Sequence, residues 1–529
     1  MNLSLAPQRN ANAWIVAGSV MLATFMEVLD TTVVNVALPH VAGNLSASID
    51  ESTWALTGYL VANAIVLPLS GWFSTLFGRK RFYMACVALF TISSALCGIA
   101  PTLGALIFFR VLQGVGGGAM QPVSQAILVE SFPKEKQGMA MAIFGMGVVF
   151  APVIGPTLGG WITDNWTWRW IFFINIPIGV LALLLTSMFV FDPPFLKRKT
   201  LAQGLKLDVM GLGLLATGLA FLEIMLDNGQ REDWFSSRLI VWSAIIAATA
   251  LAGTVVWELR VKDPVVDLRM LKDRNFALAC GLIYAIGFML YGSTMLLPVM
   301  LQTLLGYTAT LSGLVLSPGG LAVVVIMPLV GVMLGKMQPR WLIVVGLVVS
   351  AAGLFQMTGF NLQIDYRGAL SARVVQSIGI AFLFVPINTA AFAFIKKEKV
   401  NDGTGLINLA RNIGGSAGIA TATTLLARRQ QFHQQMLASH ITPLDEGYQV
   451  ASQGLTQAFV AHGSSAADAA QQAQAAVYGM VQQHAAMLAF IDAFHVFGWL
   501  CIAIIPMAVA MRSVRRRGMR AVAGECQRR

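Results

Sequence analysis

The stretch GMGVVFAPVIGPTLGGW at residues 145–161 constrains this chain most, because it combines small residues and prolines inside a long apolar run. Small residues recur there at every fourth position: Gly147, Ala151, Gly155 and Gly159. On a helix this spacing makes one smooth stripe, along which a neighbouring helix can pack closely. Pro152 and Pro156 each leave a carbonyl without its helical partner. Lipid cannot satisfy these carbonyls, so the spacing predicts a bent helix inside a bundle of other helices.

The composition of the chain places it in a membrane. Of its 529 residues, 56% are hydrophobic and only 12% are charged, too few polar residues to surround a water-soluble core of this size. Apolar runs near the roughly 20-residue length that crosses the hydrocarbon layer recur along the chain. The sequence therefore predicts an all-α polytopic membrane protein with fourteen transmembrane helices.

The positive charges indicate the orientation of these helices. Most of the 36 Lys and Arg residues fall on the side of the N-terminus, among them Arg79, Lys80 and the tail residues Arg515 to Arg517. By the positive-inside rule both termini are expected in the cytoplasm. The net charge of +11 is then explained by topology and by contact with the lipid bilayer. Nucleic acid is not expected as a partner, because no basic face is interleaved with exposed aromatics.

Internal echoes indicate a duplicated chain. VLPLSGW at 66–72 recurs as IMPLVGV at 326–332, and RVLQGVG at 110–116 recurs as RVVQSIG at 373–379. The shared register pairs the first six spans with the last six and leaves two spans unmatched. Parallel halves of this kind are typical of transporters that hold substrate at the interface of the halves and alternate access by rocking.

Six segments follow from this plan. We expect an N-terminal six-helix half at 1–190, cytoplasmic linkers with two inserted transmembrane helices at 191–274, the first five helices of the C-terminal half at 275–427, a periplasmic segment at 428–486, the last transmembrane helix at 487–511 and a basic cytoplasmic tail at 512–529. The segment 428–486 is rich in Gln, Ala and His and favours helix. It is either a solvated amphipathic excursion or a docking surface for a partner, and the sequence leaves both open.

Two acids in the first span are the candidates for proton coupling. No phosphate-binding loop of the form GxxxxGK[ST] occurs, so the energy is expected from an ion gradient, without a cofactor or a metal. Asp30 lies in mid-span, where an acid is costly enough to need a function. Glu27 lies one turn away on a similar face and either shares that role or lines the cavity as a protonated acid.

Three arginines lie within spans. Arg110 is the natural counter-charge, and we expect it to face Asp30, with protonation of the acid loosening the pair. A purely structural Arg110 that binds helix-end carbonyls is the alternative. Arg373, its repeat partner, has no evident acid opposite and reads as structural, whereas Arg411 with Asn412 either lines the central cavity or holds helix ends.

Two further acidic sites are set apart from the coupling candidates. Glu223 and Asp227 lie near the outer end of the inserted pair, where a solvated helix end is the expected reading, and no coupling role is predicted for them. Asp492 and His495 either pair along the last helix or form an ordinary interfacial pair.

With these residues in view, the chain resembles the major facilitator superfamily and, within it, the fourteen-span drug:proton antiporters of the EmrB type. The resemblance rests on LDTTVVNVALP at 29–39, GWFSTLFGRKR at 71–81, RVLQGVGGG at 110–118, GMGVVFAPVIGPTLGG at 145–160 and WRWIFFINIPIGV at 168–180. The cytoplasmic loop motif is carried by Gly71, Gly78, Arg79 and Lys80, but Thr75 replaces the usual Asp. That replacement puts a charge-based latch in doubt.

The resemblance implies a function and partners. Such proteins export hydrophobic or amphipathic drugs in exchange for protons from the bacterial inner membrane, and they join a periplasmic adaptor (membrane fusion) protein and through it an outer-membrane channel. Within the motifs, Asn35 and Gln113 join Arg373 and Arg411 as possible cavity residues. The chain is therefore expected to be a secondary transporter and not an enzyme. Export of one endogenous amphiphile, such as a fatty acid or siderophore, and a non-transporting sensor or anchor are the alternatives.

Overall fold

The computed structural model describes residues 12–133, 136–192, 208–262, 264–393, 395, 399–439, 441–442 and 445–512. Every regular element in these ranges is helical, which confirms the all-α expectation. Residues 193–207 of the expected linker and residues 513–529 of the expected basic tail lie outside the described residues.

Local capping sets many helix boundaries of the N-terminal half. Its helices are α1 (Ala13–Asn44), α2 (Ile49–Phe77), α3 (Arg79–Gly98), α4 (Leu103–Gly117), α5 (Met120–Ser131), α6 (Gln137–Asn165), α7 (Trp170–Phe173) and α8 (Asn175–Phe189). The Asn12 side chain accepts from the Trp14 N–H at the start of α1, and Ser48 and Glu51 form a capping box on α2. Gly78 joins α2 to α3 with a φ of 85°, a left-handed conformation that favours glycine.

The rest of the chain supplies the inserted pair and the C-terminal half. The inserted pair is α9 (Val209–Asn228) and α10 (Arg238–Arg260), with 3-10 turns η3 (Trp234–Ser236) before α10 and η4 (Leu268–Lys272) after it. The C-terminal half contains α11 (Arg274–Leu304), α12 (Ala309–Met333), α13 (Pro339–Met357), α14 (Tyr366–Phe392), α15 (Val400–Ser439), α16 (Glu446–Ala461), α17 (Ala466–Ala503) and α18 (Ile505–Val509).

The span count of the described residues comes close to the expected fourteen without reaching it. Twelve helices are long and apolar enough to cross a membrane, and counting the two parts of α6 as one span gives 13. Helix α6 bends by 41° between Gly138–Pro152 and Ile154–Asn165, where its prolines interrupt the helical bonds. Helix α15 takes the place of the remaining expected span but is not among the 13. The protein is a multi-pass membrane protein.

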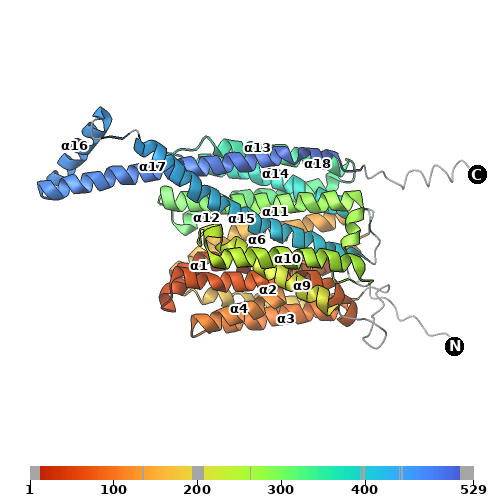
Figure 1. The fold of residues 1–529 in the computed structure, drawn as a ribbon. Coiled ribbons are helices and arrows are strands. Elements are labelled where there is room, and N and C mark those ends of the chain that lie inside the picture. The colour runs from red at the N-terminus through yellow and green to blue at the C-terminus, as the bar shows by residue number, and fades with distance from the viewer. Residues whose placement is uncertain are drawn as a thin grey trace, which may run out of the picture.

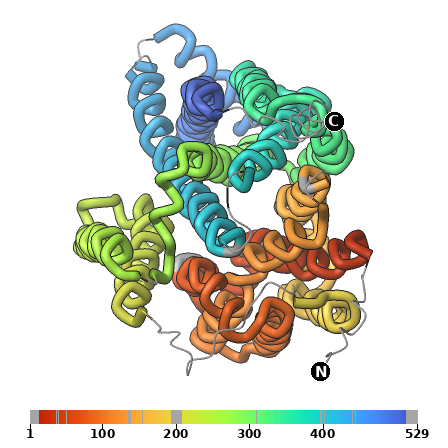
Figure 2. Tube along the Cα trace, turned by 90° about the vertical axis from the view of Figure 1, so that its right-hand side faces the viewer, coloured from red at the N-terminus to blue at the C-terminus, as the bar shows by residue number. Residues whose placement is uncertain are grey.

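The two halves form separate bundles that meet along a central seam. Figure 2 shows the N-terminal half in red to orange and most of the C-terminal half in green to blue, with α9 and α10 in yellow-green at the side. Helices α6 and α12 pack against each other across the seam, where Gly145 approaches Met327 and Phe384. On another side of the seam, α2 packs against α15.

Close helix packing at matching small residues occurs in both halves. In the N-terminal half, the small-residue stripe of α6 faces α1, with Gly155 against Thr32. In the C-terminal half, Gly414 of α15 lies against the backbone carbonyl of Tyr284 in α11. A Cβ atom at either glycine would collide with its neighbour, so the stripe allows a close approach in both halves.

Helices α15 and α17 run across the expected boundaries of the segment 428–486. Helix α15 continues to Ser439 and α17 begins at Ala466, so both helices extend beyond the bundle, and α16 lies between them in the chain. Figure 1 shows α16 and the first part of α17 projecting from one end of the bundle, opposite the end that holds α18. Helix α16 packs on α17.

Candidate functional site

A buried ion pair lies in the middle of the N-terminal half. Arg110 Nη1 of α4 donates to Asp30 Oδ2 of α1 at 2.5 Å, and the two residues are 0% and 2% exposed. Gln113 Nε2 and Asn175 Nδ2 donate to Asp30 Oδ1 at 3.0 and 2.7 Å. Arg110 Nε also donates to the Ala55 carbonyl at 3.2 Å. Both charges are therefore paired and hydrogen-bonded, as a buried ion pair requires.

The second acid of α1 is held by uncharged donors. Tyr59 Oη and Asn63 Nδ2 of α2 each donate to Glu27 Oε1 at 3.2 Å. Gln121 Nε2 of α5 donates to Glu27 Oε2 at 2.6 Å. Glu27 and Asp30 thus lie one turn apart on α1 but have separate sets of partners.

Tyr59 connects the two acidic sites. The Arg110 guanidinium lies over the Tyr59 ring, with 4.2 Å between the guanidinium carbon and the ring centroid. The hydroxyl of the same ring bonds to Glu27. A movement of Arg110 away from Asp30 would therefore disturb a partner of Glu27.

The Glu27 site also touches the C-terminal half. Arg411 Nη2 of α15 donates to Gln121 Oε1, and Asn412 Nδ2 donates to Asn63 Oδ1 at 3.4 Å. Two of the three partners of Glu27 are thus bonded across the seam. This brings Arg411 to the centre of the molecule.

Buried amides bridge the halves one turn further along α5 and α15. Gln125 Nε2 of α5 donates to Asn388 Oδ1 of α14, and Asn408 Nδ2 of α15 donates to Gln125 Oε1, both at 2.8 Å. Thr404 Oγ1 of α15 donates to the Pro122 carbonyl at 3.1 Å. These bonds are made across the seam in this structure, and rocking of the halves would break them.

Arg373 occupies the corresponding place in the C-terminal half, but among the described residues its hydrogen bonds go to no carboxylate. Its Nη1 donates to Gln376 Oε1 at 2.8 Å, and its Nη2 donates to Thr294 Oγ1 at 3.1 Å. Gln376 Nε2 in turn donates to Ser293 Oγ at 2.7 Å. The site is neutral apart from the arginine itself.

The small-residue stripe of α6 packs against the helix that carries both acids. Gly147 lies against Met21, Gly155 against Thr32 and Gly159 against Val33, all on α1. Ala151 and Pro152 are buried beside this contact, and Pro156 is partly buried. The stripe therefore sets how closely α6 approaches Asp30 and Glu27.

The cytoplasmic loop motif forms an ion pair with an acid outside the motif. Arg79 pairs with Glu130 at the end of α5. The Lys80 N–H donates to Asp192 Oδ1 at 2.9 Å. Thr75, which replaces the usual Asp, donates instead to the carbonyl of Gly71 at 3.0 Å within its own helix. The ion pair of Arg79 with Glu130 and the hydrogen bond of the Lys80 N–H to Asp192 thus hold the loop in place without an acid at position 75.

Several candidates lie outside this network. Asn35 is exposed on α1. Asp492 bonds to Arg429 Nε at 2.5 Å and His433 Nε2 at 2.7 Å on α15. His495, its expected partner along the helix, lies beside a phenylalanine ring. The described residues hold no group of three or more His, Cys, Asp or Glu side chains placed to bind a metal ion.

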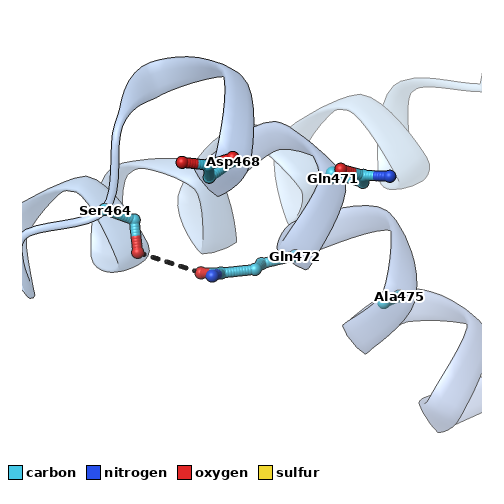
Figure 3. Close-up of a pocket in the computed structure, with 5 residues that line it drawn as sticks. All are labelled: Ser464, Asp468, Gln471, Gln472 and Ala475. Atoms are coloured by element: carbon cyan, nitrogen blue, oxygen red, sulfur yellow. Dashed lines mark hydrogen bonds between the residues drawn. The ribbon is translucent and has the colours of Figure 1, made fainter.

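Two hollows lie in the projecting helices, away from both acids. Figure 3 shows the one at the start of α17, where Ser464 Oγ donates to Gln472 Oε1 at 3.0 Å beside Asp468. A second hollow of about 340 Å³ lies between the end of α15, α16 and α17 and is lined mainly by apolar residues. Neither contains a residue of the acidic network.

Sequence reasoning missed four members of this network. Tyr59, Asn63, Gln121 and Asn175 all bond to one of the two acids. Each is a polar residue within an apolar span, where polar groups need partners. That signal was present in the sequence, but it did not reveal which acid each residue meets.

Comparisons with known proteins identify the family of this chain. The family model of the Major Facilitator Superfamily matches residues 20–419. The chain is 39% identical to the fatty acid resistance protein FarB of Neisseria gonorrhoeae, covering 86% of this chain and 89% of that protein. It is 37% identical to the multidrug export protein EmrB of Escherichia coli (strain K12), covering 84% and 86%.

A solved structure adds support for the fold alone. The human organic anion transporter MFSD10 matches with a TM-score of 0.58 at 12% identity, covering 95% of this chain and 100% of that chain. Family match, relatives and fold lead to the same conclusion: this chain is a transporter, not an enzyme, and belongs to the major facilitator superfamily, among the EmrB-type proteins.

Proposed function

We propose that this protein exports hydrophobic or amphipathic drugs across the bacterial inner membrane in exchange for protons, by alternating access. The relatives named as multidrug exporters support the drug export. The observation that carries the proton coupling is the buried pair of Asp30 and Arg110 and its bonded path to the seam. Proton-driven transport needs an ionisable group at membrane depth whose surroundings change with conformation.

The network suggests how a proton acts at a distance. Protonation of Asp30 removes the charge that holds Arg110. Arg110 then shifts against the Tyr59 ring, and the Tyr59 hydroxyl carries the change to Glu27. Gln121, which bonds both Glu27 and Arg411, passes it to the C-terminal half. Drug binding at the seam would favour proton release through the same contacts in reverse, because linkage is reciprocal.

Fourteen spans complete the proposed topology. Helix α15 would be the fourteenth span. It is less apolar than the other 13 because its polar residues Asn408 and Arg411 face the seam instead of lipid. With fourteen spans both termini lie in the cytoplasm, as the positive charges favour. The inserted pair and the two six-helix halves follow the segments expected from the sequence, except that α15 and α17 extend into the segment 428–486.

The projecting helices suit a partner outside the membrane. We propose that the segment 428–486 meets a periplasmic adaptor protein, which links this pump to an outer-membrane channel. Exposed apolar residues on the projecting helices support a docking role: Phe432, Met436, Val450 and Val460 are each exposed.

Export of one endogenous amphiphile is the second candidate. The relative named as a fatty acid resistance protein favours it, because its identity to this chain is as high as that of the multidrug exporters. A fatty acid and a drug would use the same seam, so the residues above do not separate them. A siderophore is the other endogenous candidate. A sensor or anchor without transport is the third reading.

Proton release from acidified inverted vesicles tests the proposal. Drugs and fatty acids are added separately to vesicles with the native chain and with Asp30→Asn at matched expression. Drug-induced release that vanishes in Asp30→Asn supports antiport through Asp30. Release with fatty acids alone favours the single-amphiphile reading. If no compound moves protons with the native chain, proton-driven export is rejected.

A further inference from the structure

Helix α9 of the inserted pair lies against both halves. Its residues Leu215 and Leu219 share one buried apolar cluster with Leu67 of α2 and Leu409 of α15. Figure 2 shows the inserted pair beside the place where the two bundles meet. Helix α9 therefore covers the seam between α2 and α15, and any separation of these two helices changes its contacts.

Two acids of α9 bond to opposite halves. Ser416 Oγ of α15 donates to Glu223 Oε1 at 3.1 Å. Thr57 Oγ1 of α2 donates to Asp227 Oδ2, one turn further along α9. The expectation of a solvated helix end is wrong for Glu223, which is only 4% exposed, whereas Asp227 is exposed. The tertiary structure buries Glu223 because α9 packs against α15.

The residues that follow α9 also bond to both halves. Arg231 Nη1 donates to Thr53 Oγ1 of α2 at 2.5 Å. Trp234 Nε1 donates to Thr424 Oγ1 of α15 at 3.0 Å. The outer end of the inserted pair thus has polar contacts with each half, and only those to α15 include a buried acid.

We propose that α9 is a proton-operated clasp across the α2–α15 seam, and that Glu223 is the group that binds the proton. In the closed seam the carboxyl group of Glu223 accepts a hydrogen bond from the hydroxyl of Ser416. Opening the seam would bring water to its carboxyl group. An ionised carboxylate gains more from water than a neutral acid does. Ionisation therefore favours the open seam, and protonation favours the closed seam.

The charged groups around Glu223 are few. Asp227, on α9 itself, is the charged residue that acts on it most directly. The groups that bond to this part of α9 from α2 and α15 are hydroxyls. The ionisable residues of α10 lie near its two ends: Arg238, Glu258 and Arg260. No described cation bonds to Glu223 in a way that would keep it ionised through both states.

The clasp rests on the proposed proton-driven export and adds a second protonation step to it. Asp30 lies inside the N-terminal half, whereas Glu223 is buried where α9 packs against the seam. Glu223 would be a positioning residue, which sets when the halves separate without touching the drug.

The opening of the seam can be measured directly. Spin labels at Trp54→Cys on α2 and Arg428→Cys on α15 report the distance across it, because both positions are accessible to a label. The cysteines among the described residues are buried, and Cys526 is replaced by Ser. The labelled full chain is studied in lipid nanodiscs at acid and alkaline pH without drug. We expect the long-distance population to grow at alkaline pH.

Glu223→Gln should remove this pH-dependent shift and keep the short distance throughout, because its neutral amide still fits beside Ser416. Glu232→Gln, the same change at an exposed acid in the next turn, should respond as the native chain does. The clasp is overturned if Glu223→Gln follows pH like the native chain, or if the native distance does not depend on pH.

Ser416→Ala keeps the acid and tests the clasp even if Glu223→Gln does not fold. Loss of this donor should shift the pH midpoint of the opening, and an unchanged midpoint contradicts the proposal. Proton release from vesicles is scored separately. A native chain that opens with pH through Glu223 but releases no protons keeps the clasp and removes proton-driven export. Normal proton release together with an opening that does not depend on Glu223 removes the clasp and keeps proton-driven export.

Discussion

The two halves of this protein carry the same arginine–glutamine pair but give it different partners. In the N-terminal half, Arg110 and Gln113 of α4 both bond to the carboxylate of Asp30. In the C-terminal half, the matching pair of α14 bonds to the hydroxyls of Ser293 and Thr294. The frame of helices is duplicated, whereas the acid is present in one half only.

The register of the sequence repeat shows which residue replaces the acid in the C-terminal half. The alignment that places Arg110 on Arg373 also places Asp30 on Ser293. A buried arginine without an acid has a constant charge and can only hold neighbouring groups in place. A buried arginine with an acid changes its attachment when the acid takes a proton. On this ground we propose a structural role for the arginine of the C-terminal half and a switching role for that of the N-terminal half.

Removal of each arginine should break this comparison most strongly. Arg110→Ala leaves Asp30 buried without its counter-charge, and we expect a loss of about 3–5 kcal/mol of stability. Arg373→Ala leaves only neutral partners unsatisfied and should cost about 1–3 kcal/mol. Thermal unfolding of both purified variants measures the difference. Equal losses would mean that the acid does not distinguish the two halves.

The close packing of the two stripes offers a second contrast. Gly414→Ala drives a methyl group into the backbone carbonyl of Tyr284, which cannot move aside, and should cost about 1–3 kcal/mol. Gly155→Ala meets the side chain of Thr32: another rotamer relieves the contact with Oγ1, and a small shift of α1 relieves the one with Cβ, so its cost should be smaller. Unfolding temperatures of the two variants in the same detergent check this order. The reverse order would show that α1 is held more rigidly against α6 than α11 is against α15.

An acid added to the C-terminal half sharpens the comparison. Ser293→Asp places a carboxylate beside Gln376, near Arg373, in imitation of the N-terminal site. We expect this variant to fold, because the new charge meets an arginine. In the Asp30→Asn background it should not restore drug-induced proton release, since the C-terminal site has no counterpart of the path through Tyr59. Restored release in the double variant would show that an acid beside either arginine is sufficient.

The smallest effect should come from the link between the two acids. Tyr59→Phe keeps the ring under Arg110 and removes only the hydroxyl that bonds to Glu27. Loss of one hydrogen bond should cost about 1 kcal/mol. Transport and the drug-induced proton release that reports it should both slow, because the ring keeps its contact with Arg110 but the bond to Glu27 is lost. Glu27→Gln serves as its partner in a double-mutant cycle, and full additivity of the two changes would argue against a link.

Much of the architecture was predictable because it depends on local composition. Apolar runs, the repeated motifs and the proline-bearing stripe predicted a multi-pass helical bundle and the bend in α6. The pairing of Arg110 with Asp30 also followed from charge alone, because each buried charge needs the other. The polar partners of Glu27 did not follow, because Tyr59, Asn63 and Gln121 come from two other helices whose facing could not be read from spacing.

The sequence by itself determined that the chain crosses the membrane many times, that it is duplicated, and that its acids lie in the first span. The spans and the need for a function of the acids follow from the cost of placing polar groups in lipid, which acts residue by residue, whereas the duplication is read from the repeated motifs. Only the tertiary structure decided that Arg411 reaches the Glu27 site, that Arg373 rests on hydroxyls, and that Glu223 is buried at the seam. These contacts join residues far apart in the chain, and they depend on how whole helices pack against one another.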